Sequence, residues 1–461
     1  MKQDLNSTFS ERLKKSVYHP LYNTSKGYYV LIFILLSFIA WGAYSYITQL
    51  RSGLAVTGLN DTAMWGIYIV NFVFFIGISY AGTLVSAVLR VTGAAWRTPI
   101  TRMAEVIAIV ALMIGGLMPL IDLGRPDRIL NIFIFGRLLS PLVWDILSIL
   151  TYFFACLIYL YLPLIPDMAA MRDSVGKDSS PIRRKFYAFF AAGWRNTPEQ
   201  KKWLEKGMRI MSVLIIPVAI FVHTVVSYIF SITLRPGWNS TIYGPYFVIG
   251  AIFSGTAAIL IVMVIFRKLF RLEEFITEKH FRYLSYLLMT LLLFYGYFTF
   301  TEYLTIGYKA ELAEKELLNQ LLLGQSSIWF WSFVIGGLVI PAFLVVYRKF
   351  RLIPRIVTAS VFIFLAMWIK RYVIVLGTLQ VPQIPIEVIA YQPTMVEISI
   401  TLATLSGFIL LFAIFAKLFP IISIWEVNED HKEKPSPGNA PIGEKPQISG
   451  KLEEKDGRHD A

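Results

Sequence analysis

The chain has 461 residues, of which 56% are hydrophobic and only 16% are charged. A soluble domain of this size carries about 25% charged residues because it needs a hydrated surface, so this composition excludes an ordinary soluble enzyme. A formal net charge of +13 is often found in proteins that bind nucleic acid. Here, however, the basic residues fall in the short segments between long apolar blocks.

Metal-binding side chains are scarce in the sequence. The one cysteine, Cys156, lies inside an apolar block, so the chain cannot build a disulfide or an iron–sulfur cluster by itself. Of five histidines, only His223 lies within a hydrophobic block, whereas a membrane b-type haem usually takes two axial imidazoles. We therefore expect no bound metal or haem, and no cofactor held by covalent attachment or ligation.

The apolar blocks have the length of membrane-spanning helices. Residues 1–27 are polar, and the block behind them is too long for a signal-peptide core and lacks a small-residue cleavage site, so we expect the N-terminal segment to be retained. A spanning helix needs about 20 apolar residues. Ten blocks meet this requirement: 28–50, 64–89, 103–121, 141–165, 208–233, 243–266, 283–306, 327–347, 354–378 and 396–419. The sequence predicts an all-α integral membrane protein with about ten transmembrane helices.

Basic residues set the predicted orientation of these helices. With the N-terminus in the cytoplasm, the cytoplasmic segments contain 32 of the 43 Lys and Arg residues and the outer loops contain 7. Basic residues accumulate on the cytoplasmic side of membrane proteins. Both termini are therefore predicted to be cytoplasmic, and the net charge is explained without nucleic acid as a partner.

Two cytoplasmic segments have their own expected structure. The segment 166–206 mixes basic residues with Trp194 and Trp203, which is typical of an interfacial helix, a docking site for another subunit, or a loop that contacts lipid headgroups. The tail 426–461 is rich in Pro, Gly, Glu and Lys and is predicted to be disordered.

A short internal repeat divides the chain. Phe74-Phe75-Ile76-Gly77 followed by Gly82-Thr83 matches Phe247-Val248-Ile249-Gly250 followed by Gly255-Thr256, with an offset of 173 residues. A parallel repeat makes helices two to five one four-helix bundle and helices six to nine another. Chance recurrence of small residues that serve helix packing is the alternative. The predicted domains are 1–27, the first flanking helix 28–63, the bundles 64–233 and 243–378, the last flanking helix 396–425, and the tail 426–461.

Ionisable side chains inside the membrane are the candidate functional residues, because each costs about 2.5–3.5 kcal/mol at the centre of a helix. They are Asp145, His223, Glu302, Lys370 and Arg371. Structural alternatives exist for each: Asp145 at the positive end of its helix, Glu302 paired with Arg371, Lys370 reaching outward to the membrane surface, and His223 as a satisfied core histidine. A neutral imidazole near carboxylates can accept a proton near pH 7, which favours function for His223.

Two further polar positions have structural explanations as well. Glu105 follows Arg102 by one helical turn, which indicates a structural pair, with a role in proton entry as the alternative. Tyr80 supplies a hydroxyl at the predicted middle of the membrane, where helix packing explains it.

Longer strings in the sequence are similar to one family. The residues 65–105 resemble the second and third helices of the polysulfide reductase NrfD-like membrane subunits. Further strings of this family are found at 119–126, 140–145, 164–169, 222–227, 236–247, 367–374 and 391–394. The length and the order of the strings over 28–425 resemble most the C subunit of alternative complex III, a respiratory complex that oxidises quinol.

The resemblance implies a cofactor-free subunit of two four-helix bundles with two flanking helices, in a prokaryotic cell (inner) membrane. Such subunits bind quinone or quinol near the outer face, with menaquinone as the expected form. They exchange electrons with an extracytoplasmic iron–sulfur subunit, contact other membrane subunits, and are proposed to conduct protons. By resemblance, Asp145 and His223 are the quinol proton acceptors, with Glu302 as a further candidate, and Arg371 orients the site.

The resemblance also assigns the edges of the site. Asp122 and Arg125 form its outer rim, and Glu105, Tyr80 and Lys370 lie on a proton path. The chain departs from the family pattern at several positions. The family has His at the positions of Tyr80, Asp122 and Asn239 and Glu at the position of Lys370, which puts an identical proton path in doubt.

Two other functions stay open from the sequence. A divergent complex can use the chain as the membrane anchor of a molybdopterin or sulfur-compound reductase. Intramembrane charges, a parallel repeat and glycine-broken helices are also typical of a secondary transporter or ion channel.

Overall fold

Ten long apolar helices form the molecule, which we describe from a computed structural model over residues 17–18, 21–174, 181–309, 311–346, 352–381 and 389–427. Within these residues the chain is all-helical, and ten helices are long and apolar enough to cross a membrane. The ten helices predicted from the sequence are therefore confirmed. They are α2 (Lys26–Ser52), α3 (Ile67–Val91), α4 (Thr98–Asp122), α6 (Pro141–Ser174), α8 (Pro198–Ser231), α9 (Tyr243–Leu269), α10 (Glu278–Lys309), the run α12–η3–α13 (Ser327–Val346), the run α14–η5 (Ile353–Gly377) and α15 (Met395–Leu418).

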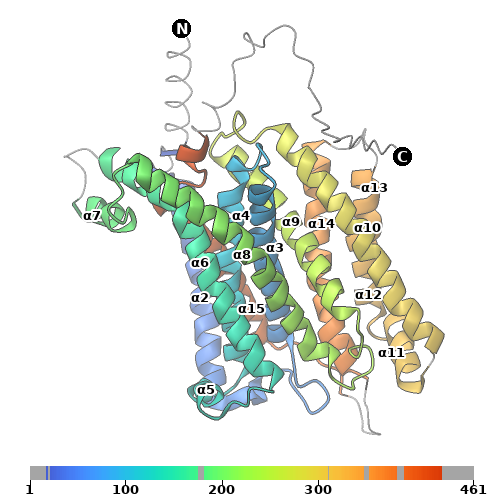
Figure 1. Cartoon of the computed structure of the whole chain (residues 1–461). Helices are drawn as coiled ribbons and strands as arrows, with labels where there is room; N and C mark the ends of the chain where they lie inside the picture. Colours follow the sequence, from blue (N-terminus) through green and yellow to red (C-terminus); the bar gives the residue numbers. More distant parts are fainter. Residues whose placement is uncertain are drawn as a thin grey trace, which may run out of the picture.

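Shorter helices connect the long ones. They are η1 (Gly53–Val56), η2 (Pro126–Arg128), α5 (Asn131–Phe135), α7 (Pro181–Phe190) and α11 (Leu312–Leu322). We call the end where α2 begins and α15 finishes the tail end, and the end that carries α5 and α11 the far end (Figure 1). The helix α7 lies inside the segment 166–206 and packs on α6 at the tail end, where a helix was one of the structures expected.

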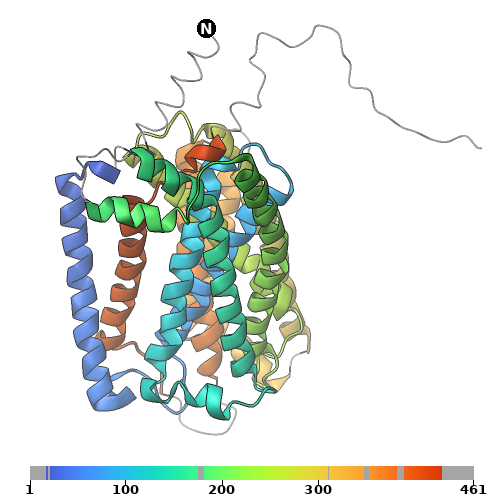
Figure 2. The ribbon, with the colours of Figure 1, turned by 60° about the vertical axis from the view of Figure 1, so that its left-hand side comes forward.

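Helix contacts divide the bundle into two rings and one pair. The helices α3, α4, α6 and α8 contact one another in a closed ring, and α9, α10, α13 and α14 form a second ring. The remaining pair, α2 and α15, stands beside the first ring (Figure 2). The residue limits predicted for the domains stay predictions.

The helix α3 is the centre of the fold. It contacts α4 and α8 in its own ring and α9 and α14 in the other, and 89% of its most apolar stretch is buried, against 17% for α2. Because α3 is apolar or small on every side, all its faces can pack on protein. Glycines allow the close approach: Gly82 lies against Ala104 of α4, and Gly255 of α9 lies against Ala81.

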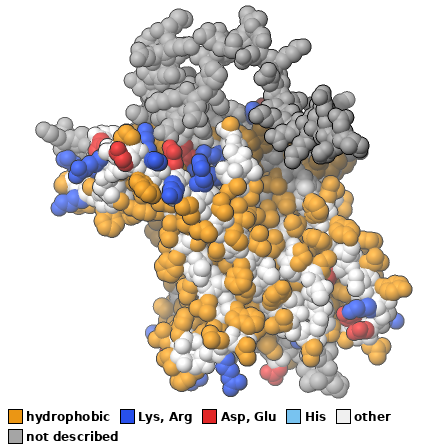
Figure 3. Space-filling view, in the orientation of Figure 1, with side chains coloured by type: hydrophobic (Ala, Val, Ile, Leu, Met, Phe, Trp, Pro, Cys, Tyr) orange, Lys and Arg blue, Asp and Glu red, His pale blue; other side chains and the backbone are white. Residues whose placement is uncertain are grey.

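Charged side chains gather where the apolar belt ends. Figure 3 shows Lys, Arg, Asp and Glu side chains over the tail end of the molecule, above a surface of hydrophobic side chains. Figure 3 is consistent with the segment counts, which put most basic residues at this end. The side of the membrane that each end faces stays a prediction.

Candidate functional site

An imidazole with at least one nitrogen that lacks a hydrogen-bond partner in the described residues lies between the two rings of helices. His223 of α8 is fully buried, and neither ring nitrogen has the geometry of a hydrogen bond to a described residue. Its ring stacks on Tyr80 of α3, with centroids 5.2 Å apart, and the Tyr80 hydroxyl is also buried without a partner. Buried polar groups are nearly always hydrogen-bonded. The backbone of Phe247 interacts with the ring but can satisfy only one of its two nitrogens, so the choice between a functional and a core histidine stays a prediction.

Arg371 of α14 lies at the same junction. Its guanidinium stands over the ring of Phe247, 5.1 Å from the centroid, and the backbones of Gly77 and Gly250 leave the space that it fills. A Cβ added at Gly250 would lie 3.3 Å from Nη2 of Arg371, and one at Gly77 would lie 3.9 Å from the same atom. These two glycines are equivalent positions of the internal repeat, so both repeats contribute one wall to the arginine.

Aromatic rings connect His223 with the far end. Phe247 of α9 contacts the His223 ring, and Phe230 of α8 contacts Phe247, with centroids 6.2 Å and 5.8 Å apart. Phe230 in turn packs edge-on against Trp65 and Trp238, which stack on each other at 5.6 Å. We call Trp65, Phe230, Trp238 and Phe247 the aromatic stack.

A π-helical turn anchors the aromatic stack. The segment η5 (Val373–Gly377) begins two residues after Arg371, and the indole of Trp238 donates a hydrogen bond of 2.7 Å to the carbonyl of Ile374. π-helical turns are rare and occur often at functional sites. The distortion of α14 just beyond Arg371 therefore positions the outer part of the aromatic stack.

Lys370 points into the second ring, away from Arg371. It is 1% exposed, and its ammonium donates to the Tyr303 hydroxyl at 2.8 Å. The rings of Tyr246, Tyr303 and Phe333 surround the ammonium at 4.8–5.3 Å from its nitrogen, a geometry that stabilises a desolvated cation. The interpretation of Lys370 as a side chain that reaches outward to the membrane surface is therefore wrong.

Glu302 faces a polar cavity rather than Arg371. Ser240 donates to its carboxylate at 2.9 Å, and no ion pair joins Glu302 to Arg371 among the described residues, so the expected structural pair is not formed. Glu302 lines a cavity of about 370 Å³ beside the far-end loop. It also lines a cavity of about 10 Å³ that reaches Lys370, which is room for one water molecule.

Asp145 is buried on α6 with one carboxylate oxygen unpartnered. It lies in the second turn from Pro141, near the far end. No described hydrogen bond or ion pair joins Asp145 to His223, although α6 packs on α8. Whether both residues serve one ligand stays a prediction.

The two residues predicted to form the rim have different surroundings. Asp122 ends α4 with one carboxylate oxygen buried and unpartnered. Arg125 is exposed and pairs with the equally exposed Asp127 at 3.0 Å, so its guanidinium is already engaged at the surface.

Glu105 belongs to a separate polar group at the tail end. Ser86 donates to Glu105 at 2.6 Å, and Arg90 lies 3.9 Å from it. Arg102 pairs instead with Asp167 of α6 at 2.5 Å. The expected Arg102–Glu105 pair is therefore wrong, because the arginine finds a fully buried acid on the neighbouring helix.

The segment behind α15 is fixed to this group. Glu426 accepts hydrogen bonds from Arg90 at 3.1 Å and from Arg97 at 2.7 Å, and Asp167 accepts from the backbone of Trp425. Burial raises the pKa of Glu426, but these guanidiniums outweigh it and hold the pKa below its ordinary value. Glu426 was predicted to begin a disordered tail; it is buried and paired, and 428–461 lie outside the described residues.

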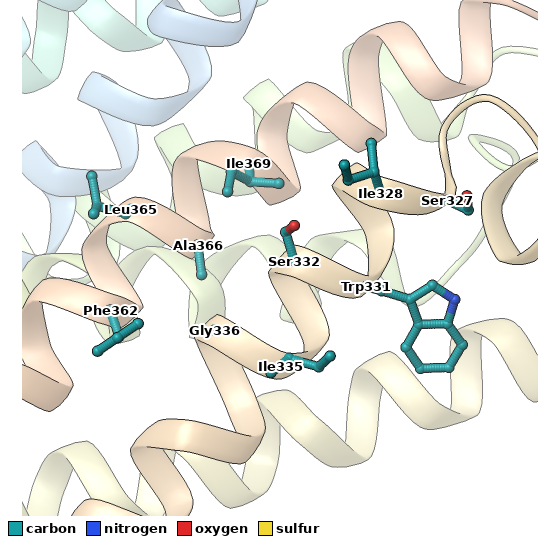
Figure 4. A pocket seen from close by; sticks show the side chains of 10 residues that line it. All are labelled: Ser327, Ile328, Trp331, Ser332, Ile335, Gly336, Phe362, Leu365, Ala366 and Ile369. Atoms are coloured by element: carbon teal, nitrogen blue, oxygen red, sulfur yellow. The ribbon is translucent and has the colours of Figure 1, made fainter.

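An apolar groove lies on the outer side of the second ring. Figure 4 shows it between α12 and α14, with Trp331, Ile335, Phe362 and Leu365 along its walls. Its volume is about 530 Å³. The groove is lined by no ionisable side chain, so it has no part in the polar group around His223.

Several of these contacts were not predicted from the sequence. Four side chains form hydrogen bonds or ion pairs with the candidate residues or with their neighbours, although each lies far along the chain from its partner: Tyr303, Trp238, Asp167 and Glu426. The one signal available in the sequence was an acid such as Asp167 within an apolar stretch near a helix end. Among the described residues, no three His, Cys, Asp or Glu side chains come together as a metal site.

An all-helical bundle of ten apolar helices, with polar side chains enclosed between two rings, defines a multi-pass integral membrane protein. Residues 55–383 match the family model described as polysulphide reductase, NrfD. Because this match covers more than half of the chain, the protein belongs to the NrfD family, as the sequence strings indicated.

Three relatives show how far the similarity extends. The C subunit of the selenate reductase of Mesobacillus selenatarsenatis is 27% identical over 88% of this chain and 98% of its own length. The Hdr-like menaquinol oxidoreductase integral membrane subunit of Archaeoglobus fulgidus is 25% identical over 87% of this chain and 95% of its own. A Halobacterium salinarum protein, described as the membrane C subunit of a dimethyl sulfoxide reductase, is 29% identical over 51% of this chain and half of its own length.

Proposed function

We propose that the chain is the quinol-reactive membrane subunit of a respiratory oxidoreductase complex. The observation that carries the proposal is the buried imidazole of His223, of which at least one nitrogen has no partner among the described residues. It lies at the inner end of an aromatic stack that starts near the far end. A planar quinol ring can stack on such side chains, and its hydroxyl would give His223 the hydrogen bond that the protein does not supply.

The chemistry follows from what a quinol must lose. Its oxidation releases two electrons and two protons, so the site needs bases close to the quinol oxygens. His223 takes the first proton and Asp145 is the candidate for the second. Arg371 holds an oxygen of the ring by charge-assisted hydrogen bonding, and the electrons pass to an iron–sulfur subunit docked at the far end.

The relatives support the part of this proposal that concerns partner subunits. They are named as subunits of selenate reductase, menaquinol oxidoreductase and dimethyl sulfoxide reductase, so we infer that this chain also anchors redox subunits to a membrane. A molybdopterin or sulfur-compound reductase is an equally suitable partner. For protons leaving toward the far end, Glu302 lines both of two cavities there, and Lys370 lines the smaller one. Glu105 is the corresponding candidate at the tail end.

Turnover of the intact complex tests the proposal. In complex purified from native membranes, His223→Ala and Asp145→Asn are each expected to lower quinol-dependent turnover at least tenfold. His280→Ala changes another buried histidine, at the tail end of α10, and should leave turnover unchanged. Thermal unfolding, and the set of proteins that co-purify, show whether each variant is folded and assembled.

Two results would contradict the proposal. Full quinol-dependent activity in the His223→Ala complex would leave the chain as an anchor without a part in quinol chemistry. Solute uptake into vesicles that contain the chain alone would favour the transporter class instead.

A further inference from the structure

A second polar cavity lies at the tail end, on the opposite side of the protein from the cavity beside Glu302. Its volume is about 600 Å³, and it lies where α3 finishes, between the first turns of α8 and the segment behind α15. Arg90, Arg97 and Arg209 line it together with Glu205 and Glu426. The lining therefore carries one more positive than negative formal charge.

The protein uses only part of this positive charge. Both oxygens of Glu426 are occupied by Arg90 and Arg97, so this one acid neutralises only one of the two guanidinium charges. Arg209 is exposed, and no ion pair or hydrogen bond involving it is found in the described part of the chain. The exposed guanidinium of Arg209 therefore offers hydrogen-bond donors to a ligand in the cavity that is an anion.

The other wall of the cavity is apolar. Met208 and Val213 of α8 line it below the arginines. From this point the outer face of α8 continues with side chains that are about half exposed: Ile210, Val213 and Leu214 at 48%, 54% and 52%. The cavity therefore has a cationic end at the charged rim of the molecule (Figure 3) and an apolar end that opens onto a hydrophobic helix face.

We propose that this cavity binds the phosphate group of an amphiphile, namely the headgroup of an anionic phospholipid whose acyl chains lie along α8. Basic pockets between membrane helices are suited to such headgroups, and guanidiniums bind phosphate oxygens through paired hydrogen bonds. Arg209 holds the phosphate, and the positive charge of Arg90 and Arg97, which stay on Glu426, favours the anion. The site does not depend on quinol chemistry.

Lipid titration of the purified full chain tests the site. After removal of native lipid, phosphatidylglycerol and phosphatidylcholine are added separately in detergent, and bound lipid is counted by native mass spectrometry. We expect phosphatidylglycerol to bind at least tenfold more tightly. Arg209→Gln should weaken it about fivefold, the contribution of one cation near an anionic headgroup, while Arg209→Lys should retain most of the affinity.

The control and the competitor separate the possible sources of phosphate. Lys268→Gln removes an exposed cation at the same end, on α9 and outside the cavity, and should bind phosphatidylglycerol like the unchanged chain. Inorganic phosphate that binds with the same sensitivity to Arg209, while the two lipids bind equally, would assign the site to a soluble phosphate. Equal binding of both lipids without any phosphate binding, or an Arg209→Gln chain that binds normally, would overturn the proposal.

Discussion

The ring of His223 lies on the ring of Tyr80, with the two planes 22° apart. The pair joins α8 to α3, the central helix of the bundle. The Tyr80 hydroxyl and at least one nitrogen of His223 have no partner within the described chain. If this contact serves packing alone, the Tyr80 hydroxyl should be dispensable. If it serves a ligand, removing the hydroxyl should weaken the binding of that ligand.

Tyr80→Phe retains the stacked ring and removes only the hydroxyl. Because this hydroxyl has no partner in the described structure, we expect an unchanged or slightly higher unfolding temperature. If the hydroxyl contacts the quinol, the KM for quinol rises several-fold. Tyr80→Ala removes the ring and should cost about 3–5 kcal/mol of stability. A marked loss of stability in Tyr80→Phe would show that a protein group uses the hydroxyl.

Gly250→Ala should impair the site, whereas Gly77→Ala should not. The new Cβ at position 250 would lie 2.7 Å from Cε2 of Tyr295, so that ring must shift, and 3.3 Å from Nη2 of Arg371, so the guanidinium must also give by a few tenths of an ångström. At position 77 the nearest contact is an ordinary 3.7 Å to Ala251. We expect at least tenfold lower turnover for Gly250→Ala and less than twofold for Gly77→Ala. Equal losses in both would mean that the position of Arg371 is not limiting.

Glu302 and Lys370 should be coupled through their shared cavity. Glu302→Gln leaves a buried ammonium without its nearby acid, and we expect a loss of about 1–3 kcal/mol. Lys370→Met fills the aromatic cage with an uncharged chain of similar length, so the double variant should recover most of this loss. The check is a double-mutant cycle of thermal unfolding. Additive single effects would show that the two side chains do not interact.

The contribution of Glu426 to stability should depend on pH. Its pKa is lower in the folded chain than the ordinary value of 4.5, so the stabilisation is complete above that ordinary value and is lost as the pH falls through the lower folded pKa. At pH 7, Glu426→Gln should unfold with about 3–5 kcal/mol less free energy, because Arg90 and Arg97 lose their acid. The two proteins should converge in strong acid. A constant difference from pH 7 to pH 3 would contradict the ion pairs.

The helices could be predicted because lipid imposes one rule on every span. Each needs about 20 apolar residues, and all ten blocks meet it. Helix ends were less accurate: α8 begins at Pro198 rather than near 208, because its first turns are polar and lie beyond the apolar block. Composition alone cannot detect a helix that continues past the hydrocarbon.

The candidate residues could be found from the sequence, but their partners could not. The cost of a charge in hydrocarbon singled out Lys370 and Glu302. The partner of Lys370 is Tyr303, 67 positions earlier, and a tyrosine in an aromatic-rich membrane helix carries no signal of that role. Pairings between helices depend on rotation and depth, which one sequence without its fold does not define.

The π-helical turn at Val373–Gly377 inserts one residue into the last spanning turn of α14. Deleting a single residue there would restore regular winding and rotate everything beyond it by about 100°. The carbonyl of Ile374 would then face away from Trp238. Deleting one residue, without removing any polar side chain, is thus expected to separate Trp238 from α14 and open the aromatic stack. Arg371, which precedes the π-helical turn, should keep its place.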